Sequence, residues 1–309
     1  MMHSPSHDVP AWPSVPSAQQ GRGALPLRYE DVTQDGRVSP RAITHALGAA
    51  LWNDALGRHP LVEALEPEGI LPILTRLMVR AGGGPVAASA TLACEGRFAL
   101  TQVRAPDGDA RYRLDLWARV EGLRGRTWGP PPEGTGECIL LGEVYGEHTL
   151  TRPFAPPEGR VVRALPAEAH EAIAVLAGRS TAPSSAADLP AGATLLDDAW
   201  VRDAAPVAFG LGHTDSNHHV NSLVYPLLLE EAALRCLAAR GLPTGRFAHA
   251  FDLAFRKPFL AGQGAQVLVR AYQRGAAVGV LGLFVPLGAG EAGDPIARAH
   301  CHGRIELIP

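Results

Sequence analysis

The 309-residue sequence has little lysine, few aromatic residues and few cysteines. Lysine occurs once, at Lys257, and the arginines that supply the remaining positive charge do not cluster. With a formal net charge of -3, the chain lacks the basic surface that marks a nucleic-acid partner. The four cysteines lie far apart and form no CxxC pair. This favours reduced thiols in a cytoplasmic protein over a disulfide framework or a zinc site.

Long hydrophobic runs are also missing. Runs such as Ile139-Leu140-Leu141 and Leu227-Leu228-Leu229 are far shorter than the roughly 18 residues that a membrane span needs. No membrane partner is therefore expected. Hydrophobic residues make up 46% of the chain and charged residues 19%, a balance typical of a globular protein.

Two stretches of low complexity divide the chain. Residues 1–25 are rich in Pro, Ser and Gln and show no periodicity, which predicts a disordered leader. Residues 180–194 combine small residues with prolines and are typical of a linker. The sequence thus predicts two domains, 26–179 and 195–309, each of ordinary domain length.

Both halves open in the same way, with a short extended stretch, a polar turn and one long helix. Ser39 in the first half and Ser222 in the second are suited to cap their helices, and Pro40 suits the first helical position. Several strand-like segments follow each helix: 72–79, 87–95, 112–120 and 139–149, then 248–256, 265–273, 278–286 and 296–308. One helix followed by a run of strands predicts an α+β fold in which the helix lies on an antiparallel sheet.

The two openings differ in their chemistry when they are superposed. Thr33 falls opposite Asp215, Asp35 opposite Asn217, and Arg37 opposite His219. A hydroxyl, a carboxylate and a guanidinium do not form the acid–imidazole pair that Asp215 and His219 can form. We therefore expect one active site per chain, in the second half.

The segment from Asp215 to Tyr225 resembles the DxNxHVNxxxY signature of hotdog-fold thioesterases. Within that superfamily, which includes the 4-hydroxybenzoyl-CoA-thioesterase-like enzymes, it is most similar to acyl-ACP thioesterases, whose single chain carries two hotdog domains. The stretches 27–30, 73–79 and 150–166 also resemble segments of that family. The resemblance implies a tandem (double) hotdog, each domain a long helix wrapped by a curved antiparallel sheet. It also implies hydrolysis of an acyl-ACP or acyl-CoA thioester in fatty-acid biosynthesis.

Two positions depart from the plant-type family. That family carries an acidic residue and a cysteine in the strand after the helix, where this chain has Pro258 and Phe259. The second asparagine of the usual tandem pair is Ser222 here. The first departure leaves open whether a complete set of catalytic groups is present.

The chemistry assigns a role to each residue of the turn. Asp215, Asn217 and His219 alternate, so their side chains can project to one side of an extended backbone. Asp215 is the candidate general base for water or, alternatively, the nucleophile itself. His219 is the candidate to share the proton or to orient the carboxylate, and Asn217 the candidate to hold water or substrate. The backbone N–H groups of Ser222 and Leu223, at the start of the helix, are candidates to stabilise the oxyanion.

Further residues are candidates for support or for substrate binding. Asn221 belongs to the motif, and Glu231 is a candidate replacement for the missing acid. The acyl-chain pocket is expected in the non-catalytic first domain, as the resemblance implies. The candidate substrate-binding residues are Tyr225, Trp52, Leu74 and Met78.

Two other readings stay open. The double hotdog fits an acyltransferase or a dehydratase of a fatty-acid or polyketide pathway, for which His45 or His59 would have to act. It also fits a non-catalytic acyl-thioester-binding protein, because of Pro258 and Phe259. No cofactor is expected, and His300 and His302 lack the further ligands that a metal site needs. The chain is expected to be a monomer or a homodimer.

Overall fold

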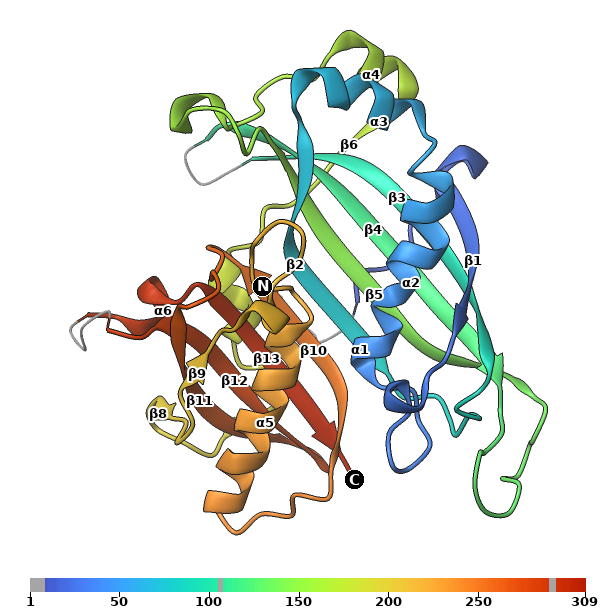
Figure 1. The fold of residues 1–309 in the computed structure, drawn as a ribbon, viewed down its shortest axis with the longest axis vertical. Coiled ribbons are helices and arrows are strands. Elements are labelled where there is room, and N and C mark those ends of the chain that lie inside the picture. Colours follow the sequence, from blue (N-terminus) through green and yellow to red (C-terminus); the bar gives the residue numbers. More distant parts are fainter. Residues whose placement is uncertain (1–8, 105–107, 289–292) are drawn as a thin grey trace. The chain divides into compact units, whose positions relative to one another are not determined.

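The computed structural model describes residues 9–104, 108–288 and 293–309. The described chain forms two compact units that divide between Thr181 and Ala182. Both are built on a mainly antiparallel sheet with few helices (Figure 1). None of the helices in these residues combines the length and the hydropathy required of a membrane-crossing helix.

The sheet of the N-terminal unit has the strand order β1-β3-β4-β5-β2. These strands are β1 (Gln20–Pro26), β2 (Leu71–Ala81), β3 (Thr91–Arg104), β4 (Ala110–Leu123) and β5 (Cys138–Thr151). Neighbours in this order pair antiparallel, and the short β6 (Val175–Ala177) adds a parallel partner to β3. The predicted strands of this half overlap β2 to β5, because alternation of apolar and polar residues marks a half-buried strand.

A helical segment runs across this sheet. It comprises α1 (Pro40–Ile43), α2 (His45–Leu47) and the π-helical η3 (Gly48–Ala55). Ser39 caps it as predicted, because its Oγ accepts from the Ala42 N–H at 3.2 Å. A Cβ at Gly21 in β1 would lie 1.9 Å from the carbonyl oxygen of Ala50, so only glycine permits this close approach of helix and strand. Two short helices, α3 (Pro60–Leu65) and α4 (Ala167–Ala172), complete the unit.

The prediction of a disordered leader is wrong for residues 9–25; residues 1–8 lie outside the described residues. The short turn η1 (Ser17–Gln19) leads into β1, which pairs with β3. Before it, Val9, Trp12 and Val15 pack against a buried cluster of the sheet. The Trp12 ring also lies 5.1 Å and 4.4 Å from the guanidinium carbons of Arg97 and Arg119. Spaced apolar residues thus bind this stretch to the sheet despite its polar composition.

The structure also differs from the predicted linker at 180–194. The turn η6 (Pro183–Ala187) buries Ala186 and Ala187, and Ala187 packs in a core cluster with Leu283 and Val285. The strand β7 (Thr194–Leu195) pairs with a strand of the C-terminal unit. The small side chains that suggested a flexible linker let this segment pack closely against the sheet.

The C-terminal unit has the strand order β10-β13-β12-β11. The strands are β10 (Phe247–Phe255), β11 (Gly264–Arg274), β12 (Ala277–Pro286) and β13 (Cys301–Ile308). Two further short strands, β8 (Val201–Arg202) and β9 (Val207–Ala208), pair with β11. The helix α6 (Pro295–Arg298) replaces the first part of the predicted strand 296–308. Its N-cap is Asp294, whose Oδ1 accepts from the Ile296 N–H at 3.0 Å.

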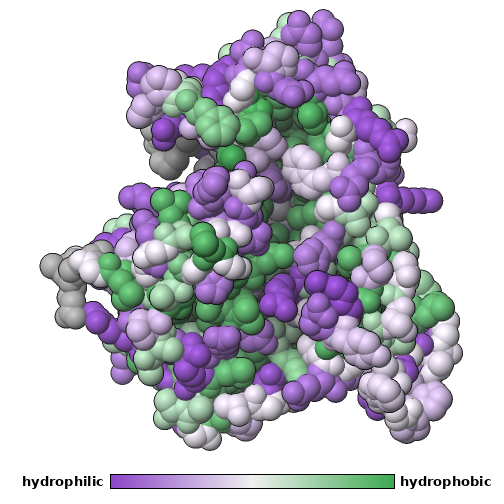
Figure 2. Space-filling view, in the orientation of Figure 1, coloured by the Kyte–Doolittle hydropathy of each residue, from purple (hydrophilic) through white to green (hydrophobic). Residues whose placement is uncertain are grey.

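The long helix α5 (Val224–Ala239) lies on this sheet and contacts β10, β11 and β13. Leu229, in its middle, is fully buried. The outer side of the helix also carries apolar residues, among them the exposed Leu227, and green residues extend over this part of the visible surface in Figure 2. The helix ends at Ala239, and the chain turns away at Gly241, whose φ of 65° suits glycine; the sequence predicts this closing glycine.

Candidate active site

Each unit carries the same short hairpin directly before its helical segment. In the C-terminal unit the Asp215 N–H donates to the His219 carbonyl at 3.0 Å, and in the N-terminal unit the Thr33 N–H donates to the Arg37 carbonyl at 2.8 Å. Isolated bridges close both hairpins, Val32 to Val38 and Thr214 to Val220. A single turn of 3-10 helix precedes each: η2 (Tyr29–Asp31) and η7 (Leu211–His213). The predicted repeat is confirmed in the backbone, in the predicted register.

The hairpin backbone fixes the Asp215 carboxylate. Its Oδ1 accepts from the Asn217 N–H at 2.9 Å, and its Oδ2 lies 3.5 Å from Nδ2 of Asn221. Asp215 itself is half-buried. Because the two oxygens are held from two sides, the carboxylate has one orientation while part of it stays accessible to water. This is the arrangement that a general base needs.

Asn221 also organises the start of α5. Its Oδ1 accepts from the Leu223 N–H at 2.8 Å and so forms an Asx turn directly before the helix, whereas the sequence argument assigned the capping role to Ser222. The Leu223 N–H, predicted to help stabilise an oxyanion, therefore already has a partner. The Ser222 N–H is the remaining candidate for that role.

His219 is anchored through its backbone rather than its ring. Its carbonyl accepts from Asp215, and it forms an isolated bridge with Leu260. The side chains of His219 and Asn217 are exposed, as is His218, whose φ of 62° places it in the left-handed region at the turn. The hairpin thus presents the imidazole and the amide outward, with the carboxylate closer to the protein.

The matching hairpin of the N-terminal unit uses its polar groups on itself. Asp35 Oδ2 pairs with Arg37 Nε at 2.8 Å, and Asp35 Oδ1 accepts from the hydroxyl of Thr33. The carboxylate is therefore neutralised by a guanidinium in its own turn. This contrast supports the expectation that one copy keeps the chemistry and the other is scaffold.

Aromatic side chains pack beneath the hairpin of the C-terminal unit. Tyr225 is buried, with its ring centroid 5.3 Å from that of Phe255 and 5.2 Å from that of Phe284. Burial raises the pKa of its hydroxyl. Phe259 is buried as well, and its carbonyl accepts from the Val220 N–H at 2.8 Å. Both aromatic residues therefore act as packing beneath the hairpin.

Glu231 lies on α5 and is exposed, and its Oε2 lies 3.7 Å from Nη1 of Arg235. Arg235 in turn forms a bidentate pair with the buried Asp203, at 2.8 Å and 2.7 Å. This arginine offsets the charge that Glu231 would bring to a reaction. No group of three or more His, Cys, Asp or Glu side chains is placed to hold a metal ion in the described parts of the chain.

The three predicted pocket residues of the first half do not lie together. Trp52 packs edge-on against His148 at 5.7 Å, and Leu74 pairs with His148 across the sheet, so both are on the helix side. Met78 instead packs with Trp117 and Tyr145, which are covered by the N-terminal residues Val9, Trp12 and Val15. A bulge between Leu74 and Arg76 reverses the alternation, and this places Met78 on the other face.

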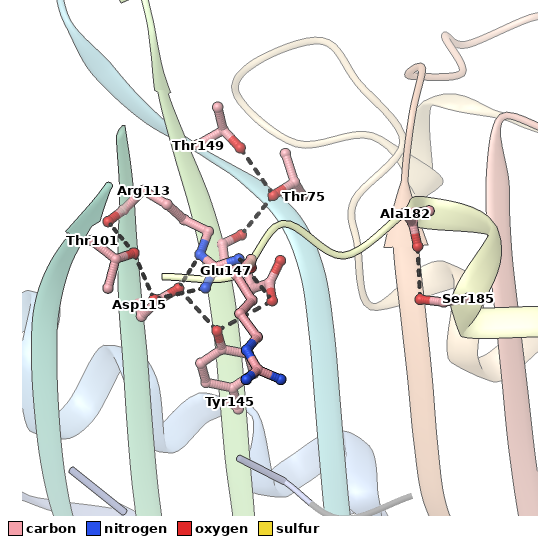
Figure 3. Close-up of polar contacts among 10 residues, drawn as sticks. Thr75, Thr101, Arg113, Asp115, Tyr145, Glu147, Thr149, Ala182 and Ser185 are labelled. Atoms are coloured by element: carbon pink, nitrogen blue, oxygen red, sulfur yellow. Dashed lines mark hydrogen bonds and ion pairs between the residues drawn. The ribbon is translucent and has the colours of Figure 1, made fainter. Parts of the chain in front are cut away.

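A buried polar cluster on that other face was not predicted. The Tyr145 hydroxyl lies 2.9 Å from Oδ1 of Asp115 and 3.2 Å from Oε1 of Glu147, and Arg113 bridges both acids (Figure 3). Thr101 adds a hydrogen bond to Asp115 at 2.8 Å. Burial raises the pKa of Glu147, against the opposing charge of Arg113. Arg113 and Asp115 alternate in β4, as Tyr145 and Glu147 do in β5, and that spacing is the signal in the sequence.

The fold is shared with solved structures over nearly the whole chain. A protein described as an oleoyl thioesterase from Lactobacillus plantarum superposes with a TM-score of 0.59 at 15% identity, covering 94% of this chain and 96% of that one. A 12:0-ACP thioesterase from Umbellularia californica gives 0.57 at 16% identity, covering 94% of each chain. An acyl-ACP thioesterase from Bacteroides thetaiotaomicron gives 0.54 at 12% identity, covering 94% and 98%.

No protein-family model matches the chain, and no curated protein sequence does. The likeness therefore concerns the fold. The resemblance that the sequence indicated is confirmed at this level: the chain is similar in fold to solved acyl-ACP thioesterases along nearly its full length.

Proposed function

We propose that this chain hydrolyses an acyl-ACP or acyl-CoA thioester to the free acid and the thiol, with Asp215 as the general base. One observation carries the proposal: the same hairpin occurs twice, and only its C-terminal copy offers an acid whose charge is not offset within the turn. The fold likeness to acyl-ACP thioesterases supports the same chemistry.

We also propose a hotdog fold for each unit. In each, the helical segment lies against the antiparallel sheet of the same unit, so that the chain is a tandem pair. The C-terminal unit is the catalytic domain and the N-terminal unit the non-catalytic domain. In this proposal Trp52 and Leu74, on the helix side of the N-terminal sheet, line the pocket for the acyl chain, and Met78 does not. The enzyme acts in the cytoplasm as a monomer or a homodimer.

The proposed reaction begins at the Asp215 carboxylate. Asp215 accepts a proton from a water molecule, and the water oxygen forms a bond to the thioester carbonyl carbon. The Asn217 amide holds the water or the substrate, and the Ser222 N–H donates to the oxyanion that develops. When the carbon–sulfur bond breaks, the proton passes to the sulfur through Asp215 and His219. The products are one carboxylic acid and one thiol.

Apolar side chains next to the hairpin suit an acyl thioester. Leu211 in η7 is 81% exposed, and Leu260, which bridges to His219, is 42% exposed. Large apolar side chains are costly to leave in water, and a bound acyl chain or pantetheine arm would cover them.

The dehydratase reading loses one of its two candidate bases in the first half, His59. The ring of His59 is used structurally, because its Nδ1 accepts from the Leu61 N–H at 3.2 Å and its ring packs edge-on against Phe98 at 5.1 Å. Burial lowers the pKa of His59 and of His45. The reading as a non-catalytic acyl-binding protein is supported by Phe259, a buried apolar ring at a position where the plant-type pattern that the sequence resembles has a cysteine.

A thiol-release assay with panels of acyl-CoA and acyl-ACP substrates tests the proposal. We expect release by the native protein, and a loss of about 10²-fold or more in Asp215→Asn, the range typical of a general base. The matched control is Asp35→Asn, which changes the carboxylate of the other hairpin and should leave the rate unchanged. Ligand binding without any thiol release would replace hydrolysis by the acyl-binding reading.

A further inference from the structure

A cavity of about 310 Å³ opens beside the hairpin of the N-terminal unit, the copy without the proposed chemistry. Three segments enclose it: residues 29–36, residues 86–88 and residues 126–128. Hydrogen bonds tie them together, from the Val86 N–H to the Gly36 carbonyl at 2.9 Å and from the Ala88 N–H to the Thr127 hydroxyl at 2.6 Å. The cavity is therefore preformed, and its volume lies at the lower end of the ~300–1,000 Å³ range of small-molecule sites.

The walls of this cavity differ from those of a packing defect. Val86 and Ala88 are buried and provide an apolar floor. Tyr29 and Trp128 also line it, yet they are 68% and 76% exposed. Two exposed aromatic rings that line a cavity of mixed polar and apolar character offer flat surfaces on which a planar ligand can stack.

The charge at the cavity comes from an arginine that nearby acids do not neutralise. The carboxylates close to the cavity pair with other arginines: Asp31 with Arg28, Asp35 with Arg37 and Glu137 with Arg124. Arg126, which lines the cavity and is exposed, takes part in none of these pairs. A guanidinium can pair with phosphate through two parallel hydrogen bonds, and it can stack on a ring as well.

We propose that this cavity is a binding site for a nucleoside phosphate. The base stacks on Tyr29 and Trp128, and the phosphate pairs with Arg126. The amide of Gln34, on the hairpin that lines the cavity, can meet a polar edge of the ligand, whereas the hydroxyl of Thr33 is already bound to Asp35. A free nucleotide and the nucleotide end of coenzyme A share this chemistry. The proposal does not depend on thioester hydrolysis, because binding is measured directly.

Isothermal titration calorimetry on the full chain tests the site with three probes: adenosine 5′-monophosphate, coenzyme A and adenosine. We expect one nucleotide per chain, and adenosine at least about tenfold weaker because it lacks the phosphate. Arg126→Gln and Trp128→Ala should each weaken nucleotide binding by about tenfold or more. The matched controls are Arg58→Gln and Phe154→Ala, which change an exposed arginine and an exposed aromatic residue outside the cavity.

The relative affinities of coenzyme A and the mononucleotide identify the source of the ligand. Tighter binding of coenzyme A than of the mononucleotide, with the same dependence on Arg126 and Trp128, supports the site and assigns the ligand to the carrier. The reverse order supports the site and assigns it to a free nucleotide. Absence of binding at millimolar concentration for both phosphates overturns the proposal, and so does binding that neither cavity variant weakens. Because the substituted side chains are exposed, unchanged thermal unfolding is expected and excludes misfolding as the cause.

Discussion

The side-chain amide of Asn221 lies 3.5 Å from Oδ2 of Asp215, six positions earlier in the chain, while its own oxygen accepts from the Leu223 N–H. One side chain therefore connects the proposed general base to the first turn of α5. The base is oriented relative to the helix start, where the Ser222 N–H is proposed to meet the oxyanion. Asn221 acts in this arrangement as a positioning residue.

Substitution of Asn221 should lower kcat with little change in KM, because the acyl group is bound elsewhere. We expect a loss of about tenfold in thiol release for Asn221→Ala, comparable to the loss of one orienting hydrogen bond to a charged group. Asn221→Asp should shift the acid limb of the pH–rate profile to higher pH, since a second carboxylate next to the first disfavours its charged form. Asn53→Ala, at an exposed asparagine, is the control. An unchanged profile in Asn221→Asp would show that Asn221 is structural only.

Trp12 should contribute to the stability of the N-terminal unit. Its ring contacts two guanidinium groups and packs on the sheet, so Trp12→Ala should lower the free energy of unfolding by about 1–2 kcal/mol. Urea denaturation followed by circular dichroism measures this change. Trp128→Ala removes an exposed tryptophan and should stay within about 0.5 kcal/mol of the native protein. Equal effects of the two substitutions would contradict the docking of residues 9–15.

The buried His148 should make stability depend on pH. Burial lowers its pKa from 6.5 to about 4, so the unfolded chain takes up a proton at this residue before the folded chain does. The contribution is fully present above pH 6.5 and is lost progressively as the pH falls toward 4. It amounts to about 3 kcal/mol at most.

The measurement for His148 is the slope of unfolding free energy against pH between 6.5 and 4. His148→Leu should flatten this slope, whatever its effect on stability at neutral pH. His170→Leu, at an exposed histidine, should leave the slope as it is. A native-like slope in His148→Leu would assign the dependence to other buried histidines.

The cross-strand pair of Asp252 and Arg304 should be costly to break. The two residues face each other in β10 and β13, are 1% and 0% exposed, and their Oδ2 and Nη2 atoms lie 3.0 Å apart. Asp252→Ala should lower the unfolding free energy by about 3–5 kcal/mol, because a buried guanidinium loses its counter-charge. Asp109→Ala breaks the exposed pair with Arg163 and should cost less than about 1 kcal/mol. Thermal unfolding of both variants measures these two losses of unfolding free energy. Equal losses for Asp252→Ala and Asp109→Ala would contradict the expectation that the buried ion pair matters more than the exposed one.

The sequence supports the local parts of this structure well. The polar turns, the Ser39 cap and the closing glycine Gly241 rest on turn and cap chemistry within a few residues, and all are found. The repeat could be read in register from residue types alone. The same local reasoning missed residues 9–25, because a stretch of polar composition can still be bound by a few apolar side chains once a sheet offers them a surface.

Residue types alone determined where an acid, an amide and an imidazole occur together and that the other copy of the hairpin lacks them. Only the tertiary structure decided how those groups are held and which neighbours share a face. The bulge between Leu74 and Arg76 shows why: one extra residue in a strand reverses the side on which every later side chain lies, so Met78 left the face of Leu74. Asn221 likewise holds the chain at the start of α5, where the sequence predicted a Ser222 cap, because its side chain reaches both the Leu223 N–H and Asp215. The face on which a side chain lies and the partners that it contacts depend on distances between segments of the chain. Those distances are set only when the chain folds.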